Sequence, residues 1–144
     1  MCAEEDHKTN VIHRRVLCME AQTEKHFDKA ADFAKLGDLE KAIALFDKAL
    51  VLEPENDMVW VLRGSLLSEL GRYPEALASY DKALAIRPDY DVAWYNRGMA
   101  LRKLARYTDA VTSFDRALTI NPAFANAKKD REMALQERDN AQGR

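Results

Sequence analysis

The sequence predicts an all-α protein in which antiparallel helix pairs stack side by side. Pro54, Pro88 and Pro122 are separated by two equal steps of 34 residues. Small and aromatic residues recur at the same step, and apolar residues recur three and four positions apart between the prolines. A constant period of this length indicates repeated helical hairpins, each of which buries its apolar face against its neighbours.

The composition excludes several classes of protein. The chain has 144 residues, of which 47% are hydrophobic and 32% charged, so it can bury a core and resembles neither a disordered nor a membrane protein. The formal net charge of −2 provides no overall attraction for nucleic acid or anionic lipid. We therefore expect no nucleic-acid partner and no membrane association.

Residues 1–22 are predicted to form an N-terminal leader that is partly helical. Residues 1–9 are polar and lack periodicity, so we expect them to be disordered. After them, Ile12, Val16, Met19 and Thr23 follow one another at steps of three and four, which is typical of one helix face. Either the first helix of the repeats extends back to about Asn10, or a separate helix precedes it.

The cysteines and the start of the chain predict a cytoplasmic location. Cys2 and Cys18 both lie outside the repeats and do not form a C-x-x-C pair, so a disulfide framework is not expected. The acidic residues near the start and the basic His13-Arg14-Arg15 do not fit a secretory signal.

Three repeats are predicted over residues 23–122, with the units 23–56, 57–90 and 91–124. Their helix pairs are expected at 23–36 with 39–52, 57–70 with 73–86, and 91–104 with 107–120. Gly37 and Gly71 suit the left-handed residue that ends a helix, whereas Ala105 lacks this freedom, so a less sharp third turn is expected. Residues suited to an N-cap lie just before or at the helix starts. These are Asp38, Asn56, Asp57, Asp91 and Thr108.

The segment 123–144 is predicted to be a capping helix, ending near Glu137, followed by a tail. Its residues are mostly charged, as expected of the last element of a repeat array, whose outer face has no neighbour.

The recurring residues resemble the tetratricopeptide repeat. The middle copy has the pattern residues Trp60, Gly64, Leu67, Gly71, Tyr73, Ala76, Tyr80, Ala83 and Pro88. The third copy has Trp94, Gly98, Leu101, Tyr107, Ala110, Phe114, Ala117 and Pro122. The first copy is looser, with His26 in place of tryptophan and Ala30 in place of glycine. The resemblance implies a right-handed α-solenoid that serves as a protein-binding scaffold, with the tryptophans on the core face. Replacement of Trp94 by alanine is then expected to cost about 3–5 kcal/mol.

The resemblance also implies that the first helix of each pair lines a concave groove. The residues predicted to line it are Phe27, Met58, Val61, Leu62, Ser65, Val92, Tyr95, Asn96, Met99 and Arg102. The set is largely apolar and contains two methionines, so the expected ligand is a peptide or an amphipathic helix of another protein.

Some relatives hold the acidic C-terminal tails of chaperones in a clamp of lysine, arginine and asparagine. The matching positions here are Phe27, Ala31, Leu62, Val92 and Asn96, of which only Asn96 has the expected type. The register one repeat later also lacks basic residues. It contains Val61, Ser65, Asn96, Asn126 and Asp130. A chaperone-tail clamp is therefore not expected.

No catalytic or metal-binding pattern is present in the sequence. His7, His13 and His26 are not spaced as ligands on one helix turn, and there is no glycine-rich phosphate loop or nucleophile motif. We expect no enzyme activity, no metal and no cofactor.

Two further features leave alternatives open. The leader could fill the groove of its own chain or of a second copy, which would give a self-associating scaffold or a swapped homodimer. Lys29, Arg63 and Arg97 form a ladder with the repeat spacing, which indicates either packed side-chain stems with solvated charges or a stripe for an acidic ligand.

Overall fold

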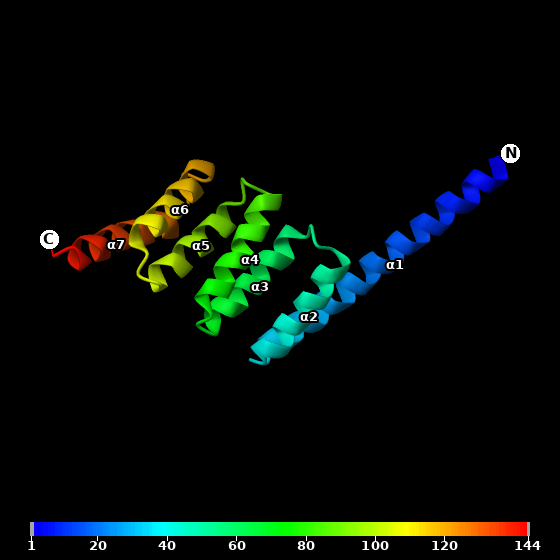
Figure 1. The fold of residues 1–144 in the computed structure, drawn as a ribbon, viewed down its shortest axis with the longest axis horizontal. Helices are drawn as coiled ribbons and strands as arrows, with labels where there is room; N and C mark the ends of the chain where they lie inside the picture. Colours follow the sequence, from blue (N-terminus) through cyan, green and yellow to red (C-terminus); the bar gives the residue numbers. More distant parts are fainter. Residues whose placement is uncertain (1, 144) are drawn as a thin grey trace. The chain divides into compact units, whose positions relative to one another are not determined.

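The computed structural model describes residues 2–143, and side chains from residue 11 onward. Within these residues it contains seven α-helices and no strands. They are α1 (Cys2–Lys35), α2 (Leu39–Leu52), α3 (Asp57–Glu69), α4 (Tyr73–Ile86), α5 (Asp91–Lys103), α6 (Tyr107–Ile120) and α7 (Ala125–Ala141) (Figure 1). The chain divides into two compact units, one containing α1 and α2 and the other containing α3 to α7.

The six repeat helices end within one residue of the predicted positions, and α1 alone begins much earlier. Asp38 and Asn56 cap α2 and α3, because their side chains accept hydrogen bonds from the backbone N–H groups of Lys41 and Val59. The caps predicted at Asp91 and Thr108 are wrong. The cap positions of α5 and α6 are Tyr90 and Arg106, and neither side chain makes a capping hydrogen bond.

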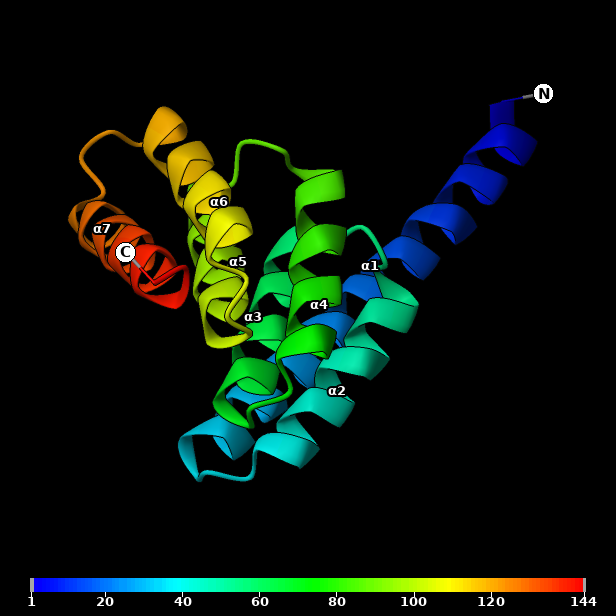
Figure 2. The same ribbon diagram turned by 60° about the vertical axis from the view of Figure 1, so that its left-hand side comes forward.

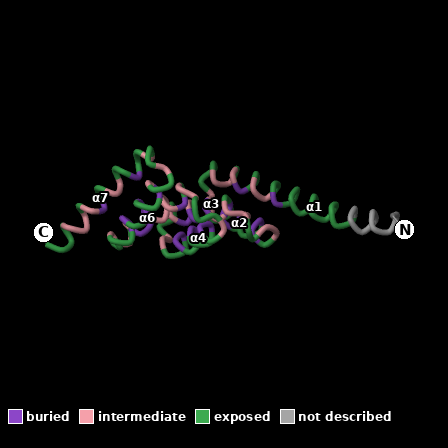
Figure 3. Tube along the Cα trace, turned by 90° about the horizontal axis from the view of Figure 1, so that it is seen from above, coloured by how far each residue is buried: buried purple, intermediate pink, exposed green. Residues whose placement is uncertain are grey.

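In the first unit, α1 is one continuous helix of 34 residues, so the leader and the first repeat helix are not separate elements. The helix begins at Cys2, so the prediction that residues 1–9 are disordered is wrong; no glycine or proline interrupts this part of the chain. α2 lies against the C-terminal part of α1, where the ring centroids of Phe27 and Phe46 are 5.9 Å apart. Residues 11–20 are exposed, as the burial-coloured trace shows (Figure 3).

In the second unit, each helix packs on the next one along the chain, α3 on α4, α4 on α5, α5 on α6 and α6 on α7 (Figure 2). The pairs α3–α4 and α5–α6 each close at a glycine that faces an aromatic ring. A Cβ atom on Gly64 would lie 2.6 Å from Cε1 of Tyr80, and one on Gly98 would lie 2.6 Å from Cε1 of Phe114. Both rings are almost completely buried, so the two helices of each pair depend on the missing side chain for their close approach.

The tryptophans lie at the edge of the core, which corrects their predicted place within it. Trp60 and Trp94 are only half-buried. The indole N–H of Trp94 donates to the carbonyl oxygen of Pro88 at 2.8 Å, and its ring lies beside the guanidinium groups of Arg97 and Arg116. The cost expected for losing a fully buried tryptophan therefore does not apply to Trp94→Ala.

The three turns within the helix pairs have the same geometry. Gly37, Gly71 and Ala105 have φ angles of 80°, 74° and 58°. In each turn the next residue donates its backbone N–H to the carbonyl five positions earlier, as Arg106 does to Leu101 at 2.9 Å. The less sharp third turn expected from Ala105 is therefore not observed.

No helix within residues 2–143 combines the length and the apolar composition needed to cross a bilayer.

Candidate functional site

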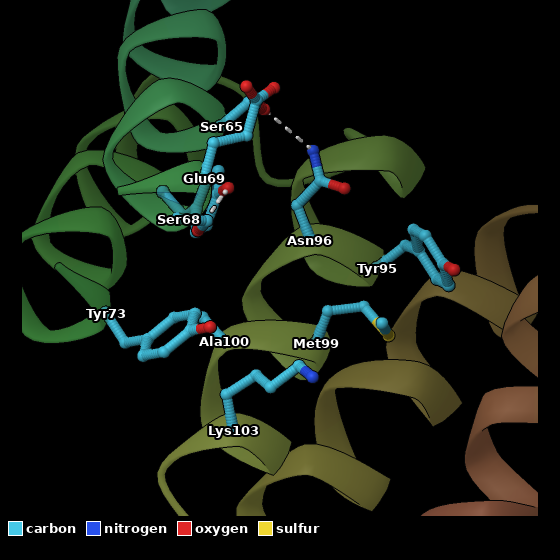
Figure 4. Close-up of a pocket in the computed structure, with 10 residues that line it drawn as sticks. Ser65, Ser68, Glu69, Tyr73, Tyr95, Asn96, Met99, Ala100 and Lys103 are labelled. Carbon is cyan, nitrogen blue, oxygen red and sulfur yellow. Dashed lines mark hydrogen bonds between the residues drawn. The ribbon is translucent and has the colours of Figure 1, made fainter. Parts of the chain in front are cut away.

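The second unit contains a hollow of about 320 Å³ between α3, α4 and α5 (Figure 4). Its walls come from the first helices of two repeats, α3 and α5, and from the second helix of one repeat, α4. The lining residues are Ser65, Ser68, Glu69, Tyr73, Tyr80, Tyr95, Asn96, Met99, Ala100 and Lys103. Three tyrosine rings and Met99 make most of this wall a surface suited to apolar groups.

Hydrogen bonds fix the polar part of the wall. The side-chain amide of Asn96 points toward α3 and donates to Oγ of Ser65 at 3.4 Å (Figure 4). The hydroxyl groups of Ser68 and Tyr80 are 3.2 Å apart. Burial raises the pKa of Tyr80, so its hydroxyl stays neutral and serves as a hydrogen-bonding group.

The charges at the hollow balance each other. Glu69 and Lys103 are its acidic and basic lining residues, and both are exposed. Within the part of the chain that the structure describes, no three His, Cys, Asp or Glu side chains are grouped as a metal site would require.

Tyr95, at the edge of the hollow, is held by α7. Its hydroxyl donates to Oδ2 of Asp130 at 2.6 Å, and its ring centroid lies 4.8 Å from that of Phe124. Burial, together with this hydrogen bond to a carboxylate, raises the pKa of Tyr95 to about 12.

Arg102 is also held by α7. Its Nε and Nη2 donate to the two carboxylate oxygens of Glu137 at 2.7 and 2.8 Å, and its Nη1 lies 3.5 Å from Oδ1 of Asp130. The side chain is 16% exposed. The guanidinium lowers the pKa of the Glu137 carboxyl, as expected of a two-bond pair. Arg102 is therefore part of the contact between α5 and α7.

Comparison with known proteins identifies the family. Two family models, each described as Tetratricopeptide repeat, match residues 27–91 and residues 92–124. The chain belongs to the tetratricopeptide repeat family. No curated protein matches it.

Solved tetratricopeptide domains share this fold. The Arabidopsis OM64 domain is 26% identical, with a TM-score of 0.78, over 82% of this chain and 97% of that chain. The first domain of Spaghetti (RPAP3), bound to the HSP90 peptide SRMEEVD, is 22% identical, with a TM-score of 0.78, over 81% and 92%. The second domain of human RPAP3, in complex with the HSP70 peptide SGPTIEEVD, is 21% identical, with a TM-score of 0.78, over 81% and 98%.

Four residues predicted from the tetratricopeptide resemblance lie together at the hollow. They are Ser65, Tyr95, Asn96 and Met99. The other six do not line it. Val61 is 4% exposed, and Leu62 is half-buried. Met58 and Val92 are exposed near the starts of α3 and α5. Phe27 packs on Phe46 in the first unit, and Arg102 pairs with Glu137 of α7.

The ten predicted groove residues leave out six of the residues that line the hollow. Ser68, Glu69, Ala100 and Lys103 follow predicted groove residues by one helix turn, so their spacing was a usable signal. Tyr73 and Tyr80 come from α4, a second helix of a tetratricopeptide pair, which the prediction had not assigned to the groove.

The repeat-spaced arginines pack against the neighbouring helix. Nη1 of Arg63 donates to Oγ of the buried Ser79 at 2.6 Å, and Nη1 of Arg97 donates to that of the buried Ser113 at 2.8 Å. Nε of Arg97 also donates to Asp81 at 2.8 Å. Of the two interpretations of the repeat-spaced ladder, packed side-chain stems rather than a stripe for an acidic ligand therefore hold for Arg63 and Arg97.

Proposed function

We propose that this chain is a protein-interaction module that binds a peptide or helix of another protein at the hollow formed by α3, α4 and α5. The observation that carries the proposal is that one hollow gathers Ser65, Tyr95, Asn96 and Met99, four of the residues that the tetratricopeptide pattern assigns to ligand contact. Membership in a family known for protein binding supports the same conclusion. No enzyme activity is part of this proposal.

The lining of the hollow favours a ligand with an uncharged apolar anchor. Tyr73 and Met99 provide apolar contact area, and Met99 can adapt its shape to different side chains. Asn96 and Ser65 provide hydrogen-bonding groups for a ligand's main chain. Glu69 and Lys103 cancel in charge, so specificity comes from shape and apolar contact.

We further propose that the module does not take acidic chaperone tails, although two structural neighbours are solved with such peptides. Lys103 is the basic residue that lines the hollow, beside Glu69. The Arg102 guanidinium is already paired with Glu137. A ligand carboxylate would have to displace that pair, which costs free energy because Arg102 is largely buried.

The test selects peptides from an unbiased library on the full chain and then measures their affinity by calorimetry. We expect Met99→Glu to weaken a selected peptide by at least about tenfold, because it places a charge in the apolar wall. Thr112→Glu, on the exposed face of α6, is the matched control and should leave the affinity unchanged. Selected peptides that bind both variants equally would refute the site.

The peptide SRMEEVD serves as the probe for acidic tails. We expect no binding to the wild-type chain. Binding of SRMEEVD that is lost in Lys103→Glu would show that the hollow accepts carboxylates, and the apolar-anchor proposal would then be wrong.

Self-association is the second candidate function, favoured by the exposed apolar residues of the leader. Val11, Ile12, Val16, Leu17 and Met19 are between 42% and 63% exposed. In the form predicted from the sequence, the leader occupies the groove of its own chain or the groove of a second copy. For either function we propose a cytoplasmic setting, which suits the free, exposed thiol of Cys18.

A further inference from the structure

The N-terminal part of α1 extends beyond the helix that it pairs with. α1 has 34 residues, whereas α2, which packs against it, has 14. Ile12, Val16 and Met19 are 63%, 46% and 42% exposed. A helix face of this kind gains stability only when another apolar surface covers it.

The exposed residues continue the buried face of the same helix. Ile12, Val16, Met19 and Thr23 follow one another at steps of four, three and four, and Ala30 comes seven residues after Thr23. Thr23 is 5% exposed and Ala30 is completely buried. The alternation of three and four is that of a coiled-coil seam, in which Val16 and Thr23 take one seam position and Ile12 and Met19 the other.

The charged residues beside this seam match a second copy of the same helix. Arg15 directly precedes Val16 on one side of the seam, and Glu20 directly follows Met19 on the other side. When two identical helices pair in parallel, each of these positions faces the opposite flank of its partner, five residues along. Arg15 of each chain then lies opposite Glu20 of the second copy, which gives two attractive pairs.

An antiparallel arrangement does not use these charges. It brings together flanks of the same kind, so the flank that carries Arg15 and Gln22 faces the same flank of the other copy, away from Glu20. Val11 and Leu17 lie away from the seam and take no part in either arrangement.

We propose that residues 11–22 of α1 pair in parallel with the same residues of a second copy, through a seam of Ile12, Val16 and Met19 and the flanking pair Arg15–Glu20. The occupant of this face is thus another helix of the same kind, and the hollow of the second unit remains open for a ligand. Because the seam spans only about two heptads, the dimer is weak and depends on protein concentration.

Sedimentation equilibrium of the full chain tests the pairing. We expect a monomer–dimer equilibrium in the wild type, and at least about tenfold weaker association in Arg15→Glu, where two attractions become two repulsions. Arg14→Glu is the matched control, because it makes the same charge change one position away from the flank. Neither arginine has a charged neighbour three or four positions away, so neither change breaks an ion pair within the helix. The exchange of charges in R15E/E20R should restore the wild-type affinity.

Several outcomes would overturn the proposal. A monomer at every concentration would show that no second copy binds this face. Equal effects of Arg15→Glu and Arg14→Glu would show that the Arg15–Glu20 pair does not form. Dissociation by Met99→Glu would place the leader in the hollow of the second copy.

Cross-linking tests the direction of the helices. In a chain with Cys2→Ser and Cys18→Ser, we expect Val16→Cys to form an intermolecular disulfide on mild oxidation, because identical seam positions meet in a parallel pair. Val11→Cys, which lies off the seam, should form little. A dimer in which Val16→Cys cross-links no better than Val11→Cys would exclude the parallel arrangement.

Discussion

At the scale of single residues, the second unit depends on two glycines that face aromatic rings. The ring of Phe114 is fully buried, so it cannot move aside for a new side chain on Gly98. In the first unit the equivalent residue is already alanine, and Ala30 is completely buried there. The looser first copy thus reaches a close helix contact without the glycine.

Gly98→Ala should destabilise the protein. Its Cβ would lie 2.6 Å from Cε1 of Phe114, and such overpacking costs about 1–3 kcal/mol. The better helix propensity of alanine offsets about 1 kcal/mol of this cost. Urea denaturation should therefore show a net decrease in the free energy of unfolding of Gly98→Ala. In a chain that already carries Phe114→Leu, the same alanine should cause a smaller decrease. A variant as stable as the wild type would mean that the ring is free to move.

Tyr95 should ionise later than an ordinary tyrosine. Its pKa is raised from 10.0 to about 12 by burial and by the hydrogen bond to Asp130. Because the folded-state pKa lies above the unfolded one, the neutral phenol stabilises the fold below pH 10, and this contribution is lost as the pH rises from about 10 to 12. The difference in phenolate absorbance between the wild type and Tyr95→Phe follows the ionisation of Tyr95. As the pH rises, this difference should have its midpoint near pH 12. A midpoint near pH 10 would contradict the contact with α7.

At the scale of the elements, the turn between α5 and α6 shows that the fold can impose a backbone conformation. Ala105 has a φ of 58°, in the region that glycine occupies in the other two turns. The left-handed conformation costs an L-residue about 1–2 kcal/mol. The hydrogen bonds of the turn and the packing of α5 on α6 offset this cost.

Ala105→Gly should therefore stabilise the protein. Relief of the strained backbone outweighs the larger entropy of glycine in the unfolded chain, and we expect a gain of about 0.5–1 kcal/mol in thermal or urea unfolding. Gly71→Ala is the reciprocal control. Gly71 has a φ of 74°, and a Cβ atom added there would meet no heavy atom within 4 Å, so the alanine should lose stability through backbone strain alone. Equal stability of both variants and the wild type would show that this strain is negligible.

The helices were predictable from the sequence because each repeat carries its own local signals. Proline spacing, apolar periodicity and the glycine turns located the ends of the six repeat helices, and the starts of all but the first, within one residue. The predictions of caps and core positions that were wrong concern residues whose environment is set by their neighbours in space. The caps at Tyr90 and Arg106 lack the usual side chains, and Trp94 resembles a core residue until its contact with Arg97 and Arg116 is known.

The hollow was only partly predictable for the same reason. The groove residues on α3 and α5 share a helix face and can be found from periodicity. Tyr80 could not be assigned, because its ring passes beside Gly64 and its hydroxyl reaches Ser68 on the other helix. The pairing of Arg102 with Glu137 joins residues 35 positions apart and has no signal in either helix alone.

At the scale of the whole molecule, each unit is held together by contacts between helices that follow one another in the chain. The stability of such a protein is close to a sum of helix-pair and neighbour terms, so different regions open independently. Residues 11–20 of the leader are all exposed, so they make few buried contacts.

Amide hydrogen exchange should follow this distribution. In dilute solution, residues 11–20 of α1 should exchange fastest among the helical residues that we compare, and the buried stretches of α4 and α6 should exchange most slowly. Raising the protein concentration should slow exchange in residues 11–20 alone if the leader pairs with a second copy. Strong protection of these residues in a monomer would contradict their exposure.

The contact between α5 and α7 also determines how the array could grow. Lys103 and Glu137 occupy the same position in successive copies, 34 residues apart, and Glu137 is the residue that pairs with Arg102. A chain lengthened by duplicating residues 91–124 would place a second Lys103 against Arg102, so attraction would become repulsion. A duplicated repeat would therefore keep the ion pair with Arg102 only if this lysine changed to an acidic residue.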